Sequence, residues 1–114
     1  MYKEKTDLVI YLLLNSDKTI QQISEFSLLP VDDVSKLSAL HRGPMKTWII
    51  ENKKLGISPK QVVHLVDHLG FTYSQLGESL QISELQANKL CNDCRIVIHK
   101  EAAWIGEHQQ LHFV

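Results

Sequence analysis

The stretch from Tyr73 to Leu90 (YSQLGESLQISELQANKL) fits the register of a helix-turn-helix, and this fit constrains the fold more than any other feature. Apolar residues stand at the four positions where the two short helices of such a motif pack together: Leu76, Leu80, Ile82 and Leu90. Gly77 stands where the helices approach most closely, a position that accepts only a very small side chain. Ser83 is predicted to cap the second helix, because its hydroxyl can accept a hydrogen bond from an otherwise unpaired backbone N–H. Gln81 replaces the usual turn glycine, and Ala87 the common branched residue.

An earlier stretch of the chain repeats this pattern. Thr19–Leu37 overlays Thr72–Leu90 after a shift of 53 positions, with five of nineteen residues identical: Thr19/Thr72, Gln22/Gln75, Glu25/Glu78, Lys36/Lys89 and Leu37/Leu90. The same shift places Val9 over Val62 and Leu12 over Leu65. With three further residues of offset, Trp48–Leu55 lies over Trp104–Leu111, so the only two tryptophans pair. We therefore predict an internal duplication into residues 1–57 and 58–114, two repeats that share one core.

The join between the repeats carries the signals of a helix start. Ser58 is placed as an N-cap and Pro59 at the first helical position, and Gly70 is placed to end that helix. We expect a helix over residues 60–69.

The segments that follow each motif are predicted to be extended. Arg95 to His99 is short and β-branched, and Met45 to Ile50 and Leu111 to Val114 are similarly apolar. A two-stranded hairpin is marginal by itself, whereas tails from both repeats could join one sheet. The expected fold is therefore mainly α with a small central antiparallel β-sheet. It is an internally duplicated, winged helix-turn-helix, in which a pseudo-two-fold axis makes one chain an internal dimer.

Length and composition limit the classes of protein. A chain of 114 residues with 44% hydrophobic and 22% charged residues is typical of a folded globular protein. No apolar run approaches the ~20 residues that a membrane span requires. The charged start and following apolar run lack a small-residue cleavage site, so we assign them to the fold and not to a signal peptide. Two cysteines provide no disulfide framework, which favours a cytoplasmic location. Nucleophile elbows, phosphate-binding glycine loops and convincing carboxylate pairs are absent, so we expect neither enzymatic activity nor a cofactor.

The second helix of each motif is predicted to read double-stranded DNA. In the later helix, the residues with base-reading or phosphate-binding chemistry are Ser83, Gln86, Asn88, Lys89 and Asn92. Asn and Gln can pair with adenine, and Lys can reach guanine or phosphate. The earlier helix, Val31 to Leu40, offers Ser35 and Lys36 and is followed by Arg42, but Asp32 and Asp33 on the same face would repel phosphate. We therefore expect the later helix to be the stronger base reader.

Further residues are predicted to hold the DNA backbone without reading sequence. The basic ones are Lys46, Lys53 and Lys54 in the first tail, and Arg95 and Lys100 in the second. Gln22 and Gln75 stand near the start of each motif, where its first helix would cross the backbone. The net charge is −1, so binding must depend on a local basic face.

Three other features have competing interpretations. Cys91 and Cys94 form a C-x-x-C with histidines downstream, but the spacing lacks a second ligand pair, so buried free cysteines are favoured over zinc. His64 and His68 stand four residues apart without an evident third ligand, which favours surface histidines over a metal site. Trp48 and Trp104 could stack on bases, but their repeat symmetry favours a place in the core.

The two motifs at Thr19–Leu37 and Thr72–Leu90, with the Trp-Ile tails, resemble the TraN-like small helix-turn-helix DNA-binding proteins of Gram-positive conjugative plasmids. The resemblance is architectural and covers nearly the whole chain. It implies an internal-dimer fold, related to excisionase-like binders, with a central antiparallel sheet. It also implies duplex DNA binding near a transfer origin or operon promoter, in a regulatory or accessory role in conjugative transfer.

The function predicted from the sequence is sequence-specific binding of double-stranded DNA by two pseudo-symmetric helix-turn-helix motifs in successive major grooves, about 34 Å apart. We expect one chain to act as an internal dimer, possible partners being conjugation or transcription proteins, with no membrane contact. The alternative is a phage or plasmid adaptor that uses the same motifs to bind a host or secretion-machinery protein.

Overall fold

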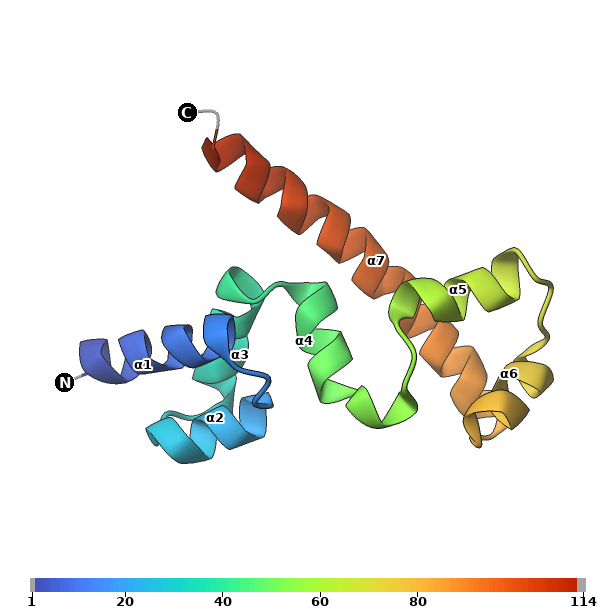
Figure 1. Ribbon diagram of the computed structural model, residues 1–114, viewed down its shortest axis with the longest axis horizontal. Coiled ribbons are helices and arrows are strands. Elements are labelled where there is room, and N and C mark those ends of the chain that lie inside the picture. Colours follow the sequence, from blue (N-terminus) through green and yellow to red (C-terminus); the bar gives the residue numbers. More distant parts are fainter. Residues whose placement is uncertain (1, 113–114) are drawn as a thin grey trace. The chain divides into compact units, whose positions relative to one another are not determined.

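The protein is helical throughout the part that the structure describes. The structure is a computed structural model that describes residues 2–112, with side chains from Lys3 to His108. Helices account for about 80% of the residues that the structure describes. Contacts divide the chain into two units, Met1–Glu51 and Asn52–Val114. Each unit is described below by itself (Figure 1).

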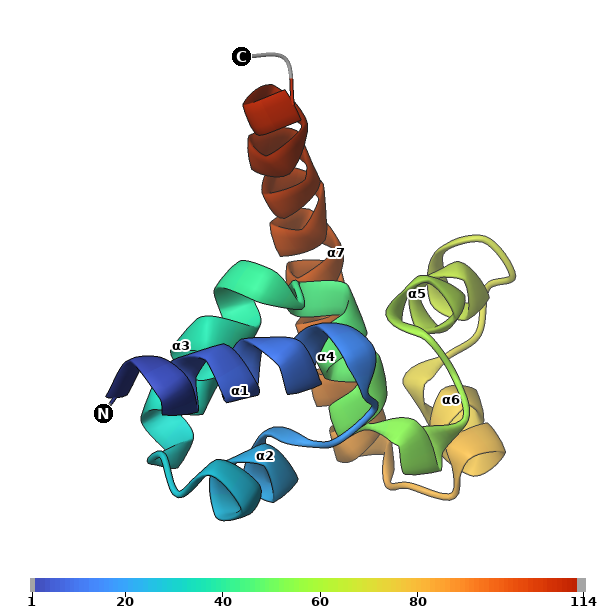
Figure 2. The same cartoon turned by 60° about the vertical axis from the view of Figure 1, so that its left-hand side comes forward.

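The first unit contains four helices: α1 (Tyr2–Asn15), α2 (Ile20–Ser27), α3 (Val31–His41) and α4 (Pro44–Glu51). Helices α1, α2 and α3 contact one another and enclose the core (Figure 2). The buried core residues are Val9, Leu13, Ile23, Leu29 and Val34. The Glu51 carboxylate at the end of α4 accepts a hydrogen bond from the Ile20 N–H at the start of α2, at 2.7 Å. The charged start and apolar run at the N-terminus thus belong to α1.

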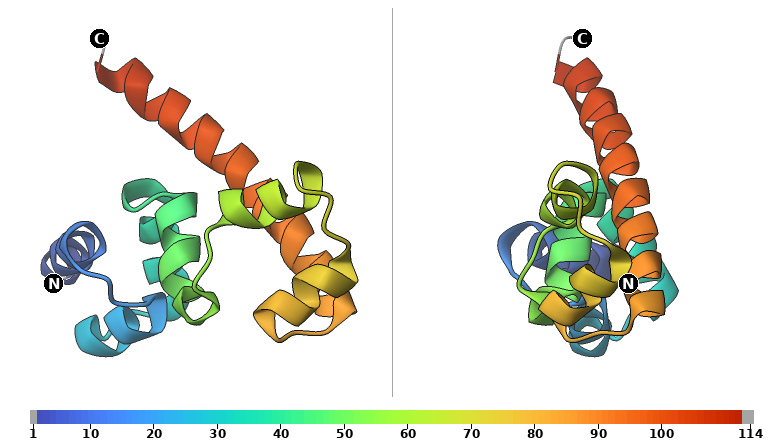
Figure 3. Two further views of the ribbon diagram at one scale, coloured as in Figure 1. Left: turned by 45° about the vertical axis from the view of Figure 1, so that its right-hand side comes forward. Right: turned by 90° about the vertical axis from the view of Figure 1, so that its right-hand side faces the viewer.

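The second unit contains a 3-10 helix, η1 (Lys53–Leu55), followed by α5 (Pro59–Asp67), α6 (Tyr73–Leu80) and α7 (Glu84–His112). Helices α5 and α6 both pack on α7, which continues beyond them (Figure 3). The buried apolar residues of this packing are Val62, Leu76, Ala87, Cys91 and Cys94.

Capping boxes that use a glutamine stand at the start of four helices: α2, α5, α6 and α7. In each box a Ser or Thr hydroxyl accepts from the backbone N–H three residues later, and the glutamine there accepts from the backbone N–H of the cap. The pairs are Thr19/Gln22, Ser58/Gln61, Thr72/Gln75 and Ser83/Gln86. The predicted caps at Ser58 and Ser83 are confirmed. Pro59 begins α5, and Gly70 follows that helix with a φ of 73°.

The predicted central antiparallel sheet is wrong, and with it the winged form of the motif. Met45–Ile50 lies inside α4, and Arg95–His99 lies inside α7. Leu111 also belongs to α7, while Phe113 and Val114 lie outside the described residues. A β-branched run lowers helix propensity only slightly, and strand preference depends largely on neighbours to pack against. The run Ile96-Val97-Ile98 therefore continues a helix that is already anchored by buried residues upstream.

The two repeats diverge because the first contains a helix breaker that the second lacks. Gly43 ends α3 with a φ of 90°, and Pro44 then begins α4. The positions that correspond to them after the shift of 53 are Ile96 and Val97, which leave α7 uninterrupted. The second unit therefore presents one long helix where the first has two short ones.

Candidate nucleic-acid interface

The predicted helix-turn-helix of the second unit is formed by α6, a short turn and the start of α7. Gln81 occupies the turn in the left-handed conformation, with a φ of 59°, which is where a glycine was expected. Gly77 is buried, and a Cβ on it would stand 2.6 Å from the Ile82 carbonyl oxygen. The Ile82 N–H donates back to the Gly77 carbonyl at 2.9 Å. The close approach predicted at Gly77 is confirmed.

The first unit reproduces the turn with different residues. Leu28, the counterpart of Gln81, is also left-handed, with a φ of 65°. Ser24 replaces Gly77, and its hydroxyl donates to the Leu29 carbonyl at 2.6 Å. Pro30 stands where the second unit has Ser83, and α3 begins without a side-chain cap.

The start of α7 presents most of the predicted base-reading residues on its outer side. Ser83, Gln86, Lys89 and Asn92 are exposed and Asn88 is half-buried, while Ala87 and Cys91 on the opposite side are buried. A shallow hollow of about 500 Å³ lies on this outer side of the helix. It is lined by Leu85, Gln86, Asn88, Lys89 and Asn92. This part of α7 is therefore accessible and slightly concave.

Asn88 and Asn92 are joined by a hydrogen bond along the helix. The Asn92 Nδ2 donates to the Asn88 Oδ1 at 3.1 Å. Asn92 keeps its second amide N–H as a donor and its carbonyl oxygen as an acceptor, side by side on one amide. One donor and one acceptor are what the N7 and N6 groups of adenine require in the major groove.

The corresponding helix of the first unit is less suited to DNA. Lys36 is exposed and Ser35 is half-buried, as a reading face needs. However, Asp32 and Asp33 are both exposed in the first turn of α3, where the second unit has Leu85 and Gln86. Two carboxylates at the entry to a groove would repel phosphate.

Arg42, predicted to contact DNA, does not lie on the surface. The residue is 4% exposed. Its guanidinium donates hydrogen bonds to four main-chain carbonyls in the last turn of α1 or just after it: Leu12, Leu13, Ser16 and Lys18. Burial lowers its pKa, and the carboxylates of Glu51 and Asp17 oppose this effect. The prediction for Arg42 is corrected, because its donors are bound to main-chain carbonyls.

Arg95, the counterpart of Arg42, also has its partner at the end of the helix that precedes the helix-turn-helix of its unit. Its Nη2 forms a salt bridge of 2.5 Å with Asp67 at the end of α5. Hydrogen bonds to Asp67 and to Tyr73 raise the pKa of Arg95. The side chain is 39% exposed. It can reach a phosphate only by competing with Asp67.

The other predicted backbone-binding residues are on the surface. Lys46 lies in α4, Lys53 and Lys54 in η1, and Lys100 in α7, and all four are exposed. Gln22 and Gln75 are exposed as well, but each Oε1 is bound to the N–H of its cap. Only their amide N–H groups remain available to a phosphate.

The structure places most of the residues that had competing interpretations. Cys91 and Cys94 are free thiols, fully buried on α7, and burial raises the pKa of Cys94 to about 12. His64 and His68 are exposed, with ring centroids 5.0 Å apart. Among the described residues, no group of three or more His, Cys, Asp or Glu side chains could hold a metal. Trp104 is half-buried and stacks on His108 at 4.0 Å.

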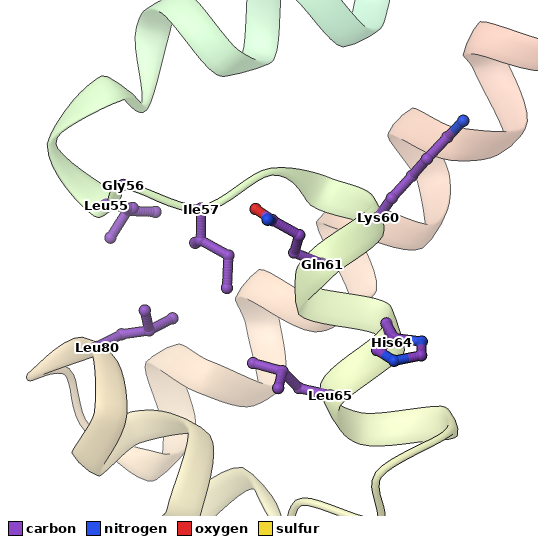
Figure 4. Close-up of a pocket in the computed structure, with 8 residues that line it drawn as sticks. All are labelled: Leu55, Gly56, Ile57, Lys60, Gln61, His64, Leu65 and Leu80. Carbon is purple, nitrogen blue, oxygen red and sulfur yellow. The ribbon is translucent and has the colours of Figure 1, made fainter.

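A second hollow, not foreseen from the sequence, lies beside α5. It is an open groove of about 620 Å³, and we call it the α5 groove. Its lining residues are Leu55, Gly56, Ile57, Lys60, Gln61, His64, Leu65 and Leu80. The apolar side chains converge on the space, Gln61 points toward Ile57, and the Lys60 side chain extends from α5 away from them (Figure 4). The apolar residues come from three separate segments, so no local sequence pattern reveals the groove.

No protein family, curated protein or solved structure matches the chain. Among the helices of residues 2–112, none has both the length and the apolar character that crossing a membrane demands.

Proposed function

We propose that the protein binds double-stranded DNA in a sequence-specific manner, and that the start of α7 is its principal base-reading element. The observation that carries the proposal is the hydrogen-bonded pair Asn88 and Asn92 on the outer side of the second helix of a helix-turn-helix. The Asn92 amide, oriented by its hydrogen bond to Asn88, offers one donor and one acceptor, which suits adenine. The exposed Lys89 can contact guanine or phosphate.

The turn geometry supports the same proposal. A left-handed Gln81 and the close approach at Gly77 fix the angle between α6 and α7. In helix-turn-helix proteins the first helix crosses the DNA backbone while the second enters the major groove. The free amide of Gln75 stands near the start of α6, where the first helix would meet a phosphate.

The two helix-turn-helix motifs that resemble TraN-like proteins extend the proposal to cell function; the central sheet that the resemblance also implied is absent from residues 2–112. We propose a cytoplasmic, non-enzymatic protein with a regulatory or accessory role in conjugative transfer, bound near a transfer origin or operon promoter. The first helix-turn-helix contributes less base reading because Asp32 and Asp33 precede its basic residue, Lys36.

A protein adaptor is the second candidate. The net charge of −1 and the exposed carboxylates of α3 favour it, because both weaken attraction to phosphate. Under this alternative both motifs bind protein surfaces.

The test is selection of bound duplexes from a random pool, together with fragments of the encoding replicon, at moderate salt. The proposal expects an enriched motif containing adenine, and the number of half-sites would report whether one unit or both read sequence. Recovery of unenriched duplexes, bound only at low salt, would refute sequence-specific binding and favour the adaptor, because such binding is purely electrostatic.

A further inference from the structure

The turn between α2 and α3 exposes three apolar side chains close together in the sequence. Phe26 is 63% exposed, Leu28 77% and Val31 40%, and Asp32 and Asp33 follow directly. We call these five residues the α2–α3 corner. The Lys18 ammonium lies 5.9 Å from the centre of the Phe26 ring, at one side of the corner.

The fold of the unit does not require these apolar residues. The second unit forms the same turn, and its residues at the positions of Phe26, Leu28 and Val31 are Ser79, Gln81 and Glu84. All three counterparts are polar. The corner is therefore a property of the first unit and not of the motif.

Leu28 is unfavourable in two respects at once. Its φ of 65° lies in the left-handed region, which strains the backbone of any residue with a β-carbon but not that of glycine. Its side chain also leaves most of its apolar surface in water. A leucine that gains nothing from its own fold is explained if the side chain is buried against another surface.

The α5 groove of the second unit has complementary properties. Leu55, Ile57, Leu65 and Leu80 supply its apolar lining, and they are all half-buried, so they remain accessible (Figure 4). No Asp or Glu lines the groove, whereas Lys60 does, and Lys53 and Lys54 stand exposed immediately before it. At the position of Lys60 the first unit has Asp7, so the basic edge belongs to the second unit alone.

We propose that the α2–α3 corner of one molecule docks into the α5 groove of a second copy of this chain. Phe26, Leu28 and Val31 would fill the apolar floor, and Asp32 and Asp33 would face the lysines at its edge. The contact is heterologous, because the two surfaces are different patches of the same chain. Head-to-tail contacts of this kind close into a ring or continue as a filament, depending on the rotation between copies. Self-association does not rest on the proposed function and needs no DNA.

The first test is analytical ultracentrifugation of the full chain without DNA over a wide concentration range. The wild-type protein should associate as its concentration rises. Leu28→Gly removes the docking side chain and relieves the backbone, so it should keep or raise the melting temperature while lowering the association constant at least tenfold. Leu69→Ser is the matched control, because Leu69 is 59% exposed in the second unit but belongs to neither surface. Association by Leu28→Gly at the wild-type level would overturn the proposal.

The second test separates a heterologous contact from other modes of association. Lys60→Glu reverses the charge at the groove and leaves the corner intact, whereas Leu28→Gly leaves the groove intact. Each variant alone should remain monomeric, and an equimolar mixture should form a one-to-one complex that grows no further. A mixture that stays monomeric would refute the proposal. Wild-type protein that stays monomeric at every concentration would also refute the proposal, whatever covers the corner in that monomer.

Discussion

The carbonyl oxygen of Ile82 lies 2.6 Å from the point that a Cβ atom on Gly77 would occupy. The carbonyl carbon and oxygen of Ser83 lie 3.2 Å from the same point, so the turn backbone rests directly on α6. In the first unit the equivalent contact, between Ser24 and Leu29, is a hydrogen bond from the serine hydroxyl. The same turn is thus stabilised by close packing in one unit and by a polar contact in the other.

Gly77→Ala should destabilise the second unit by about 1–3 kcal/mol, because the new methyl group meets backbone that cannot move independently. Urea denaturation followed by circular dichroism measures the change. Gly106→Ala is the control: it lies in α7 with nothing within 4 Å of its added Cβ. That replacement should stabilise the helix by about 0.5–1 kcal/mol. Equal effects of the two substitutions would contradict the packing described for Gly77.

Arg42→Ala should cost about 2–3 kcal/mol of first-unit stability, because it leaves carbonyls at the end of α1 without their donor. Arg42→Lys should not restore the loss, since an ammonium cannot span the same set of carbonyls. Arg95→Ala, which removes a half-exposed salt bridge, should cost under about 1 kcal/mol. Thermal and urea denaturation of the three variants test this order. A larger loss for Arg95→Ala would show that the two counterparts have been ranked wrongly.

The helix-turn-helix frame could be predicted from the sequence because its signals are local. These signals are Gly77, the cap at Ser83 and the spacing of the apolar residues, and each involves residues that stand close together in the sequence. The helical state of the tails could not be predicted, because the Ile96–Ile98 run carries a weak strand preference and its helical state depends on anchoring upstream in α7. Arg42 was mistaken for a surface residue for a similar reason. Its partners stand 24 to 30 residues earlier in the chain, so no local pattern indicates its burial.

Alkaline pH should destabilise the second unit through Cys94. Burial raises the pKa of this thiol from 9.0 to about 12, so the folded protein keeps a proton that the unfolded chain has lost. The contribution is present in full below pH 9 and declines as the pH rises toward 12, by about 1.4 kcal/mol per pH unit. Cys94→Ala should flatten the decline in unfolding free energy between pH 9 and 10.5 by about this slope. Parallel curves for wild type and variant would contradict the assignment, since lysine and tyrosine titrations are common to both.

Asn88→Ala combined with Lys89→Ala should weaken duplex binding far more than Ser35→Ala combined with Lys36→Ala. Losing one paired contact to a base costs about 1–3 kcal/mol, or roughly fivefold to more than a hundredfold in affinity. The two single changes separate base reading from charge. Asn88→Ala should relax the preference for adenine at one position, whereas Lys89→Ala, if Lys89 contacts a phosphate, should reduce the slope of log K against log salt by about one. Fluorescence anisotropy at several salt concentrations, with the selected duplex and a scrambled one, measures both effects. Equal losses from the two double variants would mean that α3 reads DNA as strongly as α7, despite Asp32 and Asp33.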